Sequence, residues 1–540
     1  MPRRAAVAGI AGAAVALAVG ELVAGLVPGA PSLVVSVGAA VIDHVPSGVK
    51  NFAVALFGLY DKLALNLGIA VIALLIGALL GVLALGRPLL VGAAFTAFGL
   101  LGFLTALDQP GASPVRAAIT TAAAVIAGLL TLRGLLREAA FGPGFRPTSP
   151  PATIPAGSET TEGPGSREAT VVEGSPRREV AAAGRAAPQV DEGRRRFIVL
   201  TAGVFAAALL SAATGRYLIQ RPREPQAGIP SAGEPVIAPP FEAGFDIVGL
   251  TPLVVPTGRF YRIDVNLVVP RVDVDTWRLR ISGMVDREVE LAYDEILAMP
   301  LVERYITIAC VSNEVGGDLV GNAAWRGVPL RTLLDLAGVK EGATQIVGRA
   351  VDGFTVGFPT ELAYDGREAL LAVGMNGEPL PPAHGFPARL VVPGLYGYVS
   401  ATKWLEEIEL TTLEAFDAYW VPRGWAKFGP VKTQSRIDVP RPGRVKAGPV
   451  TIAGVAWAPH RGISKVEVSV DGGPWTQTEL SAPLSDDAWR QWRTTWEAGT
   501  GQHALRVRAT DGSGQVQTEE VRPPFPDGAS GYHAVRVSVV

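Results

Sequence analysis

Residues 305–313 read Tyr305-Ile306-Thr307-Ile308-Ala309-Cys310-Val311-Ser312-Asn313, an apolar, strand-like run that ends where a glycine-rich loop begins. Cys310 is the only cysteine among the 540 residues. One thiol cannot form an internal disulfide or a cysteine-rich zinc site, so its use narrows to packing, nucleophilic catalysis or a single bond to a metal. Because free cysteines are usually buried and behave as small hydrophobic residues, packing is the default interpretation when this stretch is taken alone.

Two flanking segments change that interpretation. The loop after the cysteine reads Val315-Gly316-Gly317-Asp318-Leu319-Val320-Gly321-Asn322, and a later segment reads Asn376-Gly377-Glu378-Pro379-Leu380-Pro381-Pro382-Ala383-His384-Gly385-Phe386-Pro387-Ala388-Arg389. In this order they resemble the molybdopterin-binding core of the sulfite oxidase family, and the resemblance covers about residues 245–540. It implies that Cys310 gives its thiolate to molybdenum, since a soft thiolate donor suits a high-valent metal held by dithiolene sulfurs.

The resemblance also implies a set of cofactor-binding residues. Arg389 and the glycine-rich loops could hold the phosphate and the polar rim of a pterin. Arg389 could instead be a surface charge after a turn, and Lys403 could be a solvated residue before a buried Trp404. Lys432 and Arg436 either close over the site or bridge two domains. The expected cofactor-binding residues are Cys310, Asn313, His384, Arg389, Lys403, Ser400 and, on a looser match, Arg262.

Two departures from the family pattern concern the substrate. Sulfite oxidases carry a tyrosine a few residues before the Asn-Gly motif, and Val373 stands at that position here. The paired arginines that follow the metal-binding cysteine in sulfite oxidases are replaced by Val315-Gly316-Gly317. Because those arginines help to form an oxyanion pocket, sulfite specificity is not predicted, and the direction of oxygen transfer stays open.

The N-terminal part predicts a membrane region. The mean hydropathy of the chain is +0.29, which is high for a soluble protein, and the excess is concentrated in runs of about 20 residues, the length that crosses a bilayer. Residues 31–45 are too short and carry Asp43 and His44, so an interfacial or re-entrant piece is expected there. The predicted spans are four within 1–139, at 5–27, 64–85, 88–107 and 115–136, and a fifth within 194–220.

Loop charges predict the orientation of these spans. Arg3, Arg4, Arg87, Arg133, Arg137 and Arg194 to Arg196 all fall on the cytoplasmic side if the N-terminus is inside. Residues 140–193 are rich in Pro, Gly and Ser and are predicted to be a disordered cytoplasmic linker. Five spans then place the catalytic domain outside the cytoplasm. Arg194-Arg195-Arg196-Phe197-Ile198 resembles a twin-arginine export signal, which suits a cofactor inserted in the cytoplasm, although an ordinary basic flank reads the same way.

Two soluble domains are predicted after the last span. Residues 241–429 mix short strands and helices in an α+β pattern: 277–281 alternate as a half-buried strand, 289–300 suggest a short helix, and 328–337 place four apolar residues on one helical face. Residues 430–540 show all-β alternation with closely spaced turns, which suggests an immunoglobulin-like sandwich. The family resemblance implies that this last domain makes a homodimer contact.

Taken together, the sequence predicts a membrane-anchored, extracytoplasmic molybdopterin oxidoreductase that transfers an oxygen atom on a small oxyanion or oxide. An S-oxide or N-oxide reductase of the same fold is one alternative, and a non-catalytic surface protein with a degenerate enzyme domain is another. Haem is not evident, because one cysteine excludes a Cys-x-x-Cys-His site and His44 is the sole histidine of the membrane half. A separate cytochrome or quinone-linked carrier is therefore expected to exchange the electrons. The net charge of -2 gives no nucleic-acid footprint.

Overall fold

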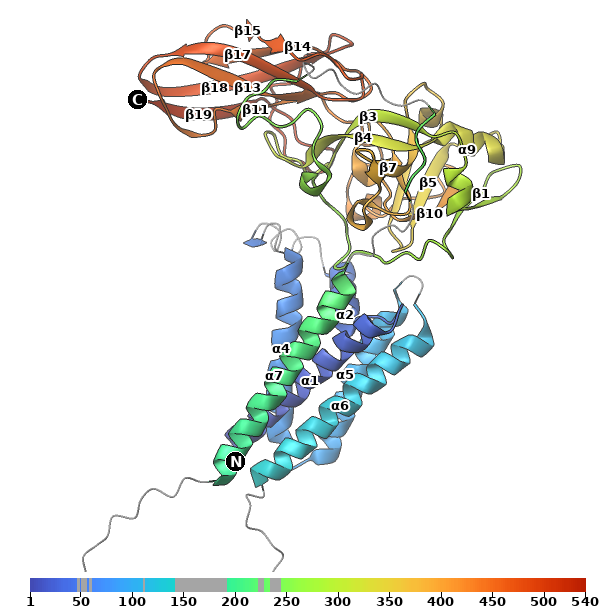
Figure 1. Ribbon diagram of the computed structural model, residues 1–540, viewed down its shortest axis with the longest axis vertical. Coiled ribbons are helices and arrows are strands. Elements are labelled where there is room, and N and C mark those ends of the chain that lie inside the picture. The colour runs from blue at the N-terminus through green and yellow to red at the C-terminus, as the bar shows by residue number, and fades with distance from the viewer. Residues whose placement is uncertain are drawn as a thin grey trace, which may run out of the picture. The chain divides into compact units, whose positions relative to one another are not determined.

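The computed structural model describes residues 1–45, 49, 56–57, 61–109, 112–140, 192–221, 228–233 and 244–540 (Figure 1). The predicted linker at 140–193 lies almost entirely outside the described residues. The described chain forms two compact units. The first is helical and N-terminal, and the second contains residues 220–540.

The helical unit is organised around its first helix. Glycines let this helix approach its neighbours closely: a Cβ on Gly9 would lie 2.0 Å from the carbonyl oxygen of Gly77, and one on Gly12 would lie 3.0 Å from that of Gly128. Small residues at such crossings are typical of tightly packed apolar helices. The helices of this unit are α1 (Pro2–Leu26), α2 (Leu33–His44), α4 (Asp61–Leu83), α5 (Pro88–Leu107), α6 (Pro114–Ala140) and α7 (Glu192–Gln220).

Among the described residues, five of these helices are long and apolar enough to cross a membrane. They span Pro2–Leu26, Lys62–Leu83, Pro88–Leu107, Pro114–Ala139 and Arg195–Gln220, close to the predicted runs. The helix Leu33–His44 has only 12 residues, as its short apolar run indicated. Length and composition therefore agree with the expected spans.

The part of the second unit before residue 430 is β-rich, with short helices at the ends of strands rather than an even α+β mixture. One sheet has the order β2-β1-β10-β5-β6, and another has the order β3-β4-β7-β8 with β9 paired to β7. Their strands are β1 (Arg278–Gly283), β2 (Val289–Ala292), β3 (Val302–Ala309), β4 (Val320–Pro329), β5 (Gln345–Ala350), β6 (Thr355–Pro359), β7 (Leu370–Met375), β8 (Glu378–Pro379), β9 (Arg389–Val391) and β10 (Leu405–Thr411). The short helices are α8 (Tyr293–Leu297), α9 (Leu330–Ala337) and α10 (Gly397–Ser400).

Local patterns account for these elements. In β1 the apolar residues Leu279 and Ile281 are fully buried between exposed arginines, as the predicted alternation requires. All four residues of the predicted apolar face of α9 are buried, and Gly338 ends the helix with a φ of 71° that favours glycine. The segment 289–300 differs from the prediction: its first residues pair with β1, and only Tyr293–Leu297 is helical.

The C-terminal part is a sandwich of two sheets, ordered β11-β13-β17-β16 and β12-β19-β18-β14-β15. Inward residues such as Val466, Leu505 and Val537 form one apolar core. The predicted turn after β14 is present, with positive φ at Asp471 and Gly472. The strands are β11 (Gln434–Val439), β12 (Gly443–Val445), β13 (Gly448–Trp457), β14 (Ile463–Val470), β15 (Thr476–Gln477), β16 (Glu479–Leu480), β17 (Arg490–Ala498), β18 (Gly501–Asp511) and β19 (His533–Val539). Immunoglobulin kinship and the boundary at 430 stay predictions.

The sandwich is joined to the strand that ends at the cysteine. Trp489 packs into the core formed around the two sheets of β1 to β10, and its backbone N–H donates to Thr307 Oγ1 over 2.8 Å. The Thr307 N–H in turn donates to the carbonyl of Asp487 over 2.9 Å. Thr307 lies in β3, so the sandwich fixes the strand that delivers Cys310.

Candidate active site

Cys310 is the first residue after β3, where the strand turns into a loop. Its N–H donates to the carbonyl of Leu319 over 2.9 Å, so the loop closes back on the residue that starts it. Within that loop Asn313 is buried, and its Oδ1 accepts a hydrogen bond from the N–H of Leu319 over 2.8 Å. Asn313 therefore shapes the cysteine loop and is not among the residues that line the adjoining cavity.

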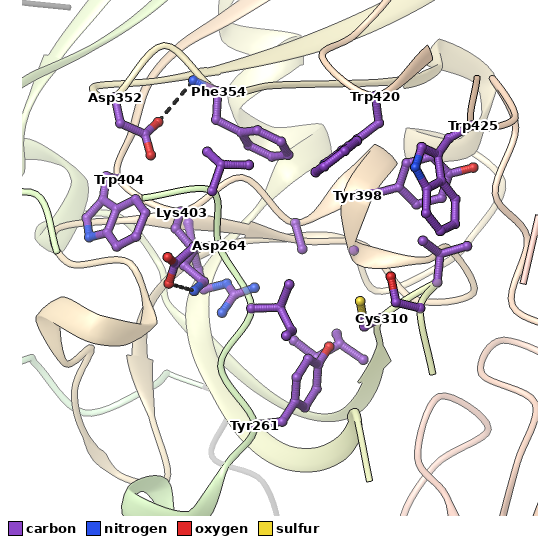
Figure 2. Close-up of a pocket in the computed structure, with 18 of the residues that line it drawn as sticks. Tyr261, Asp264, Cys310, Asp352, Phe354, Tyr398, Lys403, Trp404, Trp420 and Trp425 are labelled. Carbon is purple, nitrogen blue, oxygen red and sulfur yellow. Dashed lines mark hydrogen bonds and ion pairs between the residues drawn. The ribbon is translucent and has the colours of Figure 1, made fainter. Parts of the chain in front are cut away.

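The Cys310 side chain opens into a cavity of about 150 Å³ within the second unit. Figure 2 shows Asp264, Lys403 and Trp404 at one end and Trp420, Trp425 and Tyr398 at the other, with Cys310 near the second group. We call these the charged end and the aromatic end. Gly397, which precedes Tyr398, lies against the cysteine strand, because a Cβ there would be 3.7 Å from the carbonyl oxygen of Ala309.

Lys403 and Asp264 form the centre of the charged end. The Lys403 ammonium lies 3.2 Å from Asp264 Oδ2, and both side chains are almost fully buried. Burial lowers the pKa of Lys403 to about 8, and the positive charges of Arg389 and Arg262 act in the same direction against Asp264. Arg262 lies 3.3 Å from Asp264 Oδ2, is about half exposed and does not line the cavity.

Arg389 is the second cation of the cavity lining. It begins β9, is 3 % exposed, donates through Nη1 to the carbonyl of His384 over 3.1 Å and stacks on the ring of Trp325. Burial lowers its pKa to about 10. The surface-charge alternative for Arg389 is therefore wrong, because the side chain is inside.

His384 lies behind this end rather than in the cavity lining. Its Nε2 is 3.2 Å from the carbonyl oxygen of Thr257, and its ring meets Phe260 edge to face. Burial lowers the pKa of His384 to about 4, with Arg389 and Lys403 adding to the effect, so the ring is neutral at pH 7. Ser400 also lies outside the lining, and its hydroxyl donates to the carbonyl of Tyr396 over 3.0 Å at the end of α10.

The aromatic end comes from segments that carried no motif. Trp420 and Trp425 are half-buried, with ring centroids 6.3 Å apart, and Tyr398 lies 5.9 Å from Trp425. The hydroxyl of Tyr398 is used by the protein, since it donates to the carbonyl of Ala426 over 2.7 Å. Phe354 adds a fourth ring to the lining.

Tyr261 is a site residue that the sequence argument missed. It lines the cavity, and Figure 2 shows its hydroxyl pointing inward below Cys310. Burial raises its pKa, the negative charge of a Cys310 thiolate adds to the effect, and Arg389 opposes it, so the phenol is neutral and able to donate. Tyr261 immediately precedes Arg262, a predicted cofactor-binding residue, and this is the only feature of the sequence that could have indicated it.

The Cys310 thiol itself is shielded. Burial raises its pKa, while hydrogen bonding with Ser312 acts the other way. A metal ion would overcome this, because coordination deprotonates a thiol outright. Val373, at the position of the family's tyrosine, is fully buried in β7 and does not line the cavity.

The glycines after the cysteine are fixed by the sandwich. A Cβ on Gly316, whose φ is +81°, would lie 2.2 Å from the ring of His533. Arg436 donates to the carbonyl of Gly317 over 2.6 Å, which settles its role as a bridge between the two parts. Lys432 also stays outside the cavity lining and pairs with Asp527 over 3.1 Å.

Comparison with known proteins identifies the family of this chain. The model of the oxidoreductase molybdopterin binding domain matches residues 266–420. An uncharacterised oxidoreductase of Bacillus subtilis, YuiH, is 37% identical over 153 residues, which are 28% of this chain and 74% of that protein. The chain therefore belongs to the sulfite oxidase family of molybdopterin-binding oxidoreductases.

Longer relatives match less completely. Human mitochondrial sulfite oxidase is 32% identical over 308 residues, 48% of this chain and 56% of that protein, and the rat enzyme is 31% identical over 51% of this chain and 60% of its own length. The chain thus spans less than two thirds of these relatives. The sulfane dehydrogenase SoxCD of Paracoccus pantotrophus is a similar solved structure, with 25% identity, a TM-score of 0.47 and coverage of 53% of this chain and 81% of that one.

The residues present fit the molybdenum cofactor that this family implies. The cavity offers one thiol as a soft donor, and its charged end has a positive potential, since Arg389, Lys403 and Arg262 together depress the pKa of His384. A buried positive potential of this kind is stabilised by an anionic group, and a pterin phosphate is such a group. Cys310 would bind the metal, and Arg389 and Lys403 would hold the anionic part of the pterin.

Proposed function

We propose that this protein is a membrane-anchored, extracytoplasmic molybdenum oxidoreductase that transfers an oxygen atom to or from a small substrate. The observation that carries the proposal is the Cys310 side chain, which opens into the same cavity as the buried cations Arg389 and Lys403. That combination offers a soft metal ligand and an anion-binding end in one enclosed space.

The chain's own residues have separate tasks in this reaction. When bound, the molybdenum cofactor supplies a two-electron centre that can accept or donate an oxygen atom. Cys310 anchors it, and the hydrogen bond from the Cys310 N–H to Leu319 keeps the loop, and so the thiol, in place. Arg389 is held by the His384 carbonyl before any ligand arrives, so little side-chain entropy is lost on binding. Tyr261 and Ser312 line the same cavity as the thiol and carry hydroxyl groups that could donate to a ligand there.

Metal and pterin analysis of the purified full-length protein tests this proposal. We expect stoichiometric molybdenum and a pterin that fluoresces after oxidation. Cys310→Ser should lose turnover while keeping its thermal transition, because a hard alkoxide donor alters the electronics of the metal. Ser464→Ala, in the sandwich, is the control for a small polar change away from the cavity. Protein free of molybdenum, or near-native turnover by Cys310→Ser, would contradict the proposal.

Location is the second part of the proposal. Five helices could cross a membrane, and Arg3, Arg4, Arg87, Arg133, Arg137 and Arg194 to Arg196 would share the cytoplasmic side if the N-terminus is inside. In that orientation residues after about 220 would lie outside the cytoplasm. Because the cofactor is inserted in the cytoplasm, the folded domain must then be exported, and Arg194 to Arg196 are the proposed signal. A separate cytochrome or quinone-linked carrier would exchange the electrons, and the sandwich would form a homodimer contact.

Conservative substitution separates an export signal from a plain anchor. Changing Arg194, Arg195 and Arg196 to Lys keeps the positive flank but removes a twin-arginine motif. We expect the catalytic domain to become resistant to protease added to intact cells, because it stays inside. The paired change of Arg133 and Arg137 to Lys, at the end of α6, should leave protease sensitivity unchanged. Normal export of the triple variant would contradict the signal.

A further inference from the structure

We propose that the aromatic end of the cavity selects neutral organic oxides, in which a sulfur or nitrogen atom bears one oxygen and apolar substituents, over oxyanions such as sulfite or nitrate. This inference rests on the proposed function and names the substrate class of the same site. It follows from three observations: the charge of the lining, the aromatic wall next to Cys310, and the hydroxyl of Tyr261.

The lining has no cation to spare for an anionic substrate. Its charged residues are Asp264 and Asp352 against Arg389 and Lys403, two of each sign. Lys403 is already paired with Asp264, and Arg389 is held by the His384 carbonyl. Once an anionic cofactor occupies the charged end, an oxyanion would bring a further negative charge into a shielded space without a partner, which is strongly unfavourable.

The loop after Cys310 has no space for cationic side chains next to the cysteine. Gly316 has no room for a side chain against His533, and the Gly317 carbonyl is held by Arg436. The Arg436 guanidinium therefore donates its hydrogen bonds to the loop backbone, to Asp438 and to Thr251, and it does not line the cavity. The cationic side chains among the described lining residues are Lys403, which Figure 2 shows at the charged end, and Arg389, whose charge acts on Lys403 and His384.

The wall beside Cys310 suits an apolar, polarizable substituent. Trp420, Trp425 and Tyr398 surround this end, and the two tryptophans are half-buried, so their rings are reachable from the cavity. The Tyr398 hydroxyl is bonded to Ala426, which leaves ring carbons as the surface it presents. Aromatic rings bind hydrocarbon and sulfur-bearing groups well and offer nothing to compensate an anion.

A neutral oxide still needs one hydrogen-bond donor at its oxygen, and Tyr261 supplies it. The hydroxyl points into the cavity beside Cys310, and none of the described residues forms a hydrogen bond with it. One donor matches one oxygen, whereas sulfite and nitrate present three. The residues thus give a place for the metal at Cys310, for the oxide oxygen at Tyr261 and for the organic substituents at the tryptophans.

The reaction is balanced by an external electron source. For a sulfoxide, R₂SO + 2 H⁺ + 2 e⁻ gives R₂S + H₂O: the sulfur–oxygen bond breaks, sulfur keeps the electron pair, and the oxygen leaves as water. A one-electron carrier delivers the two electrons in successive steps, and the protons come from solvent. An amine N-oxide follows the same balance.

A substrate panel on the full-length, molybdenum-loaded protein tests the inference. With reduced methyl viologen as donor, we expect kcat/KM for methyl phenyl sulfoxide or pyridine N-oxide to exceed that for nitrate by about a hundredfold or more, since an unpaired buried charge is far costlier than an aromatic contact is favourable. Sulfite is assayed in the oxidative direction with ferricyanide. The two organic oxides distinguish sulfur from nitrogen substrates.

Variants of the wall give a readout that does not depend on turnover. Quenching of tryptophan fluorescence by methyl phenyl sulfoxide, measured without reductant, should weaken about tenfold in Kd for Trp420→Leu or Trp425→Leu. Trp475→Phe, in the sandwich where Trp475 stacks on Tyr532, is the matched control and should bind normally. Tyr261→Phe should keep molybdenum and bind the probe while losing about tenfold in kcat.

The outcomes separate the two proposals. Protein that lacks molybdenum overturns the proposed function. Two results would overturn the substrate class alone. One is molybdenum-loaded protein that prefers sulfite or nitrate, and the other is an affinity for methyl phenyl sulfoxide that is unchanged in both tryptophan variants.

Discussion

The charged end and the aromatic end of the cavity differ in how far the protein itself satisfies their groups. At the charged end every named polar group has a partner: Lys403 pairs with Asp264, and Arg389 reaches the His384 carbonyl and the Trp325 ring. At the aromatic end the rings of Trp420 and Trp425 are only half-buried. Below Cys310, outside both ends, the Tyr261 hydroxyl has no hydrogen bond among the described residues.

This difference indicates which end meets a permanent ligand and which meets a changing one. Prearranged charges hold a fixed anion at low entropic cost, whereas open rings and one free donor tolerate substrates that enter and leave. If that is correct, substitutions at the charged end should change cofactor content, and those at the aromatic end should change substrate binding while cofactor content stays the same.

Arg389→Ala should have the largest effect on cofactor content. Losing a buried charge-assisted contact costs on the order of 2 kcal/mol or more, about thirtyfold in affinity. We expect a purified variant with little molybdenum and pterin, and a smaller loss for Arg389→Lys, which keeps the charge but not the planar fork. Arg493→Ala, an exposed sandwich residue paired with Glu479, is the control. Full molybdenum content in Arg389→Ala would make Arg389 a structural residue.

Opposite changes within the Lys403–Asp264 pair sharpen the comparison. Lys403→Met removes a positive charge from the charged end and should weaken cofactor binding about tenfold. Asp264→Asn removes the opposing negative charge, so it should keep or increase cofactor content. The measurement is molybdenum per protein after dialysis. Equal losses in both variants would show that the pair matters for folding and not for the sign of the local potential.

Glycine substitutions test whether the cysteine loop must be fixed by the sandwich. Gly316 and Gly366 both have positive φ, so alanine is strained at either position, but only at Gly316 would the added Cβ meet a neighbour, the His533 ring at 2.2 Å. We expect Gly366→Ala to cost about 1 kcal/mol, and Gly316→Ala to cost more and to lower molybdenum content. The readouts are the thermal transition and metal analysis. Similar behaviour of the two variants would remove the link between loop and sandwich.

The same contrast explains what the sequence could predict. Cys310, Arg389 and Lys403 are chemically conspicuous and stand in spaced motifs, and all three line the cavity. The five long apolar helices follow from the length of the apolar runs, and the strands β1 and β14 follow from the alternation of apolar and polar residues. Because these features depend on local sequence, a single amino-acid sequence is enough to predict them.

Other features of the site depend on tertiary packing and could not be predicted from the sequence. Trp420 and Trp425 follow β10 in a segment without motif or period, and only the folded chain brings them next to Cys310. Asn313, Ser400 and His384 stand in or beside the motifs, yet they support loops and neighbours outside the cavity lining. Their residue types suggested ligand contact because a sequence does not show which polar groups the backbone already uses.

The remaining test concerns a buried carboxylate outside the cavity. Asp487 lies where the sandwich meets β3, and its Oδ1 has no hydrogen-bond partner among the described residues. Burial raises its pKa to about 6, and the nearby Glu368 adds to the shift. Unlike Asp264, which is paired with Lys403, this carboxylate gains no close ion pair in its charged form, because burial lowers the pKa of the neighbouring His460.

A raised carboxyl pKa has a definite sign for stability. Between about pH 4 and 6 the folded protein keeps a proton that the unfolded chain has released, so this contribution is present at low pH and is lost as the pH rises through about 6. Asp487→Asn cannot titrate, and its stability relative to the parent should therefore improve from pH 4.5 to pH 7, by on the order of 2 kcal/mol, which is a few degrees in Tm.

All ten tryptophans lie between Trp277 and Trp496, so their fluorescence follows the unfolding of this unit alone. Exposed Asp275→Asn is the control, and a Tm difference for Asp487→Asn that does not change with pH would show that the carboxylate is compensated where it lies.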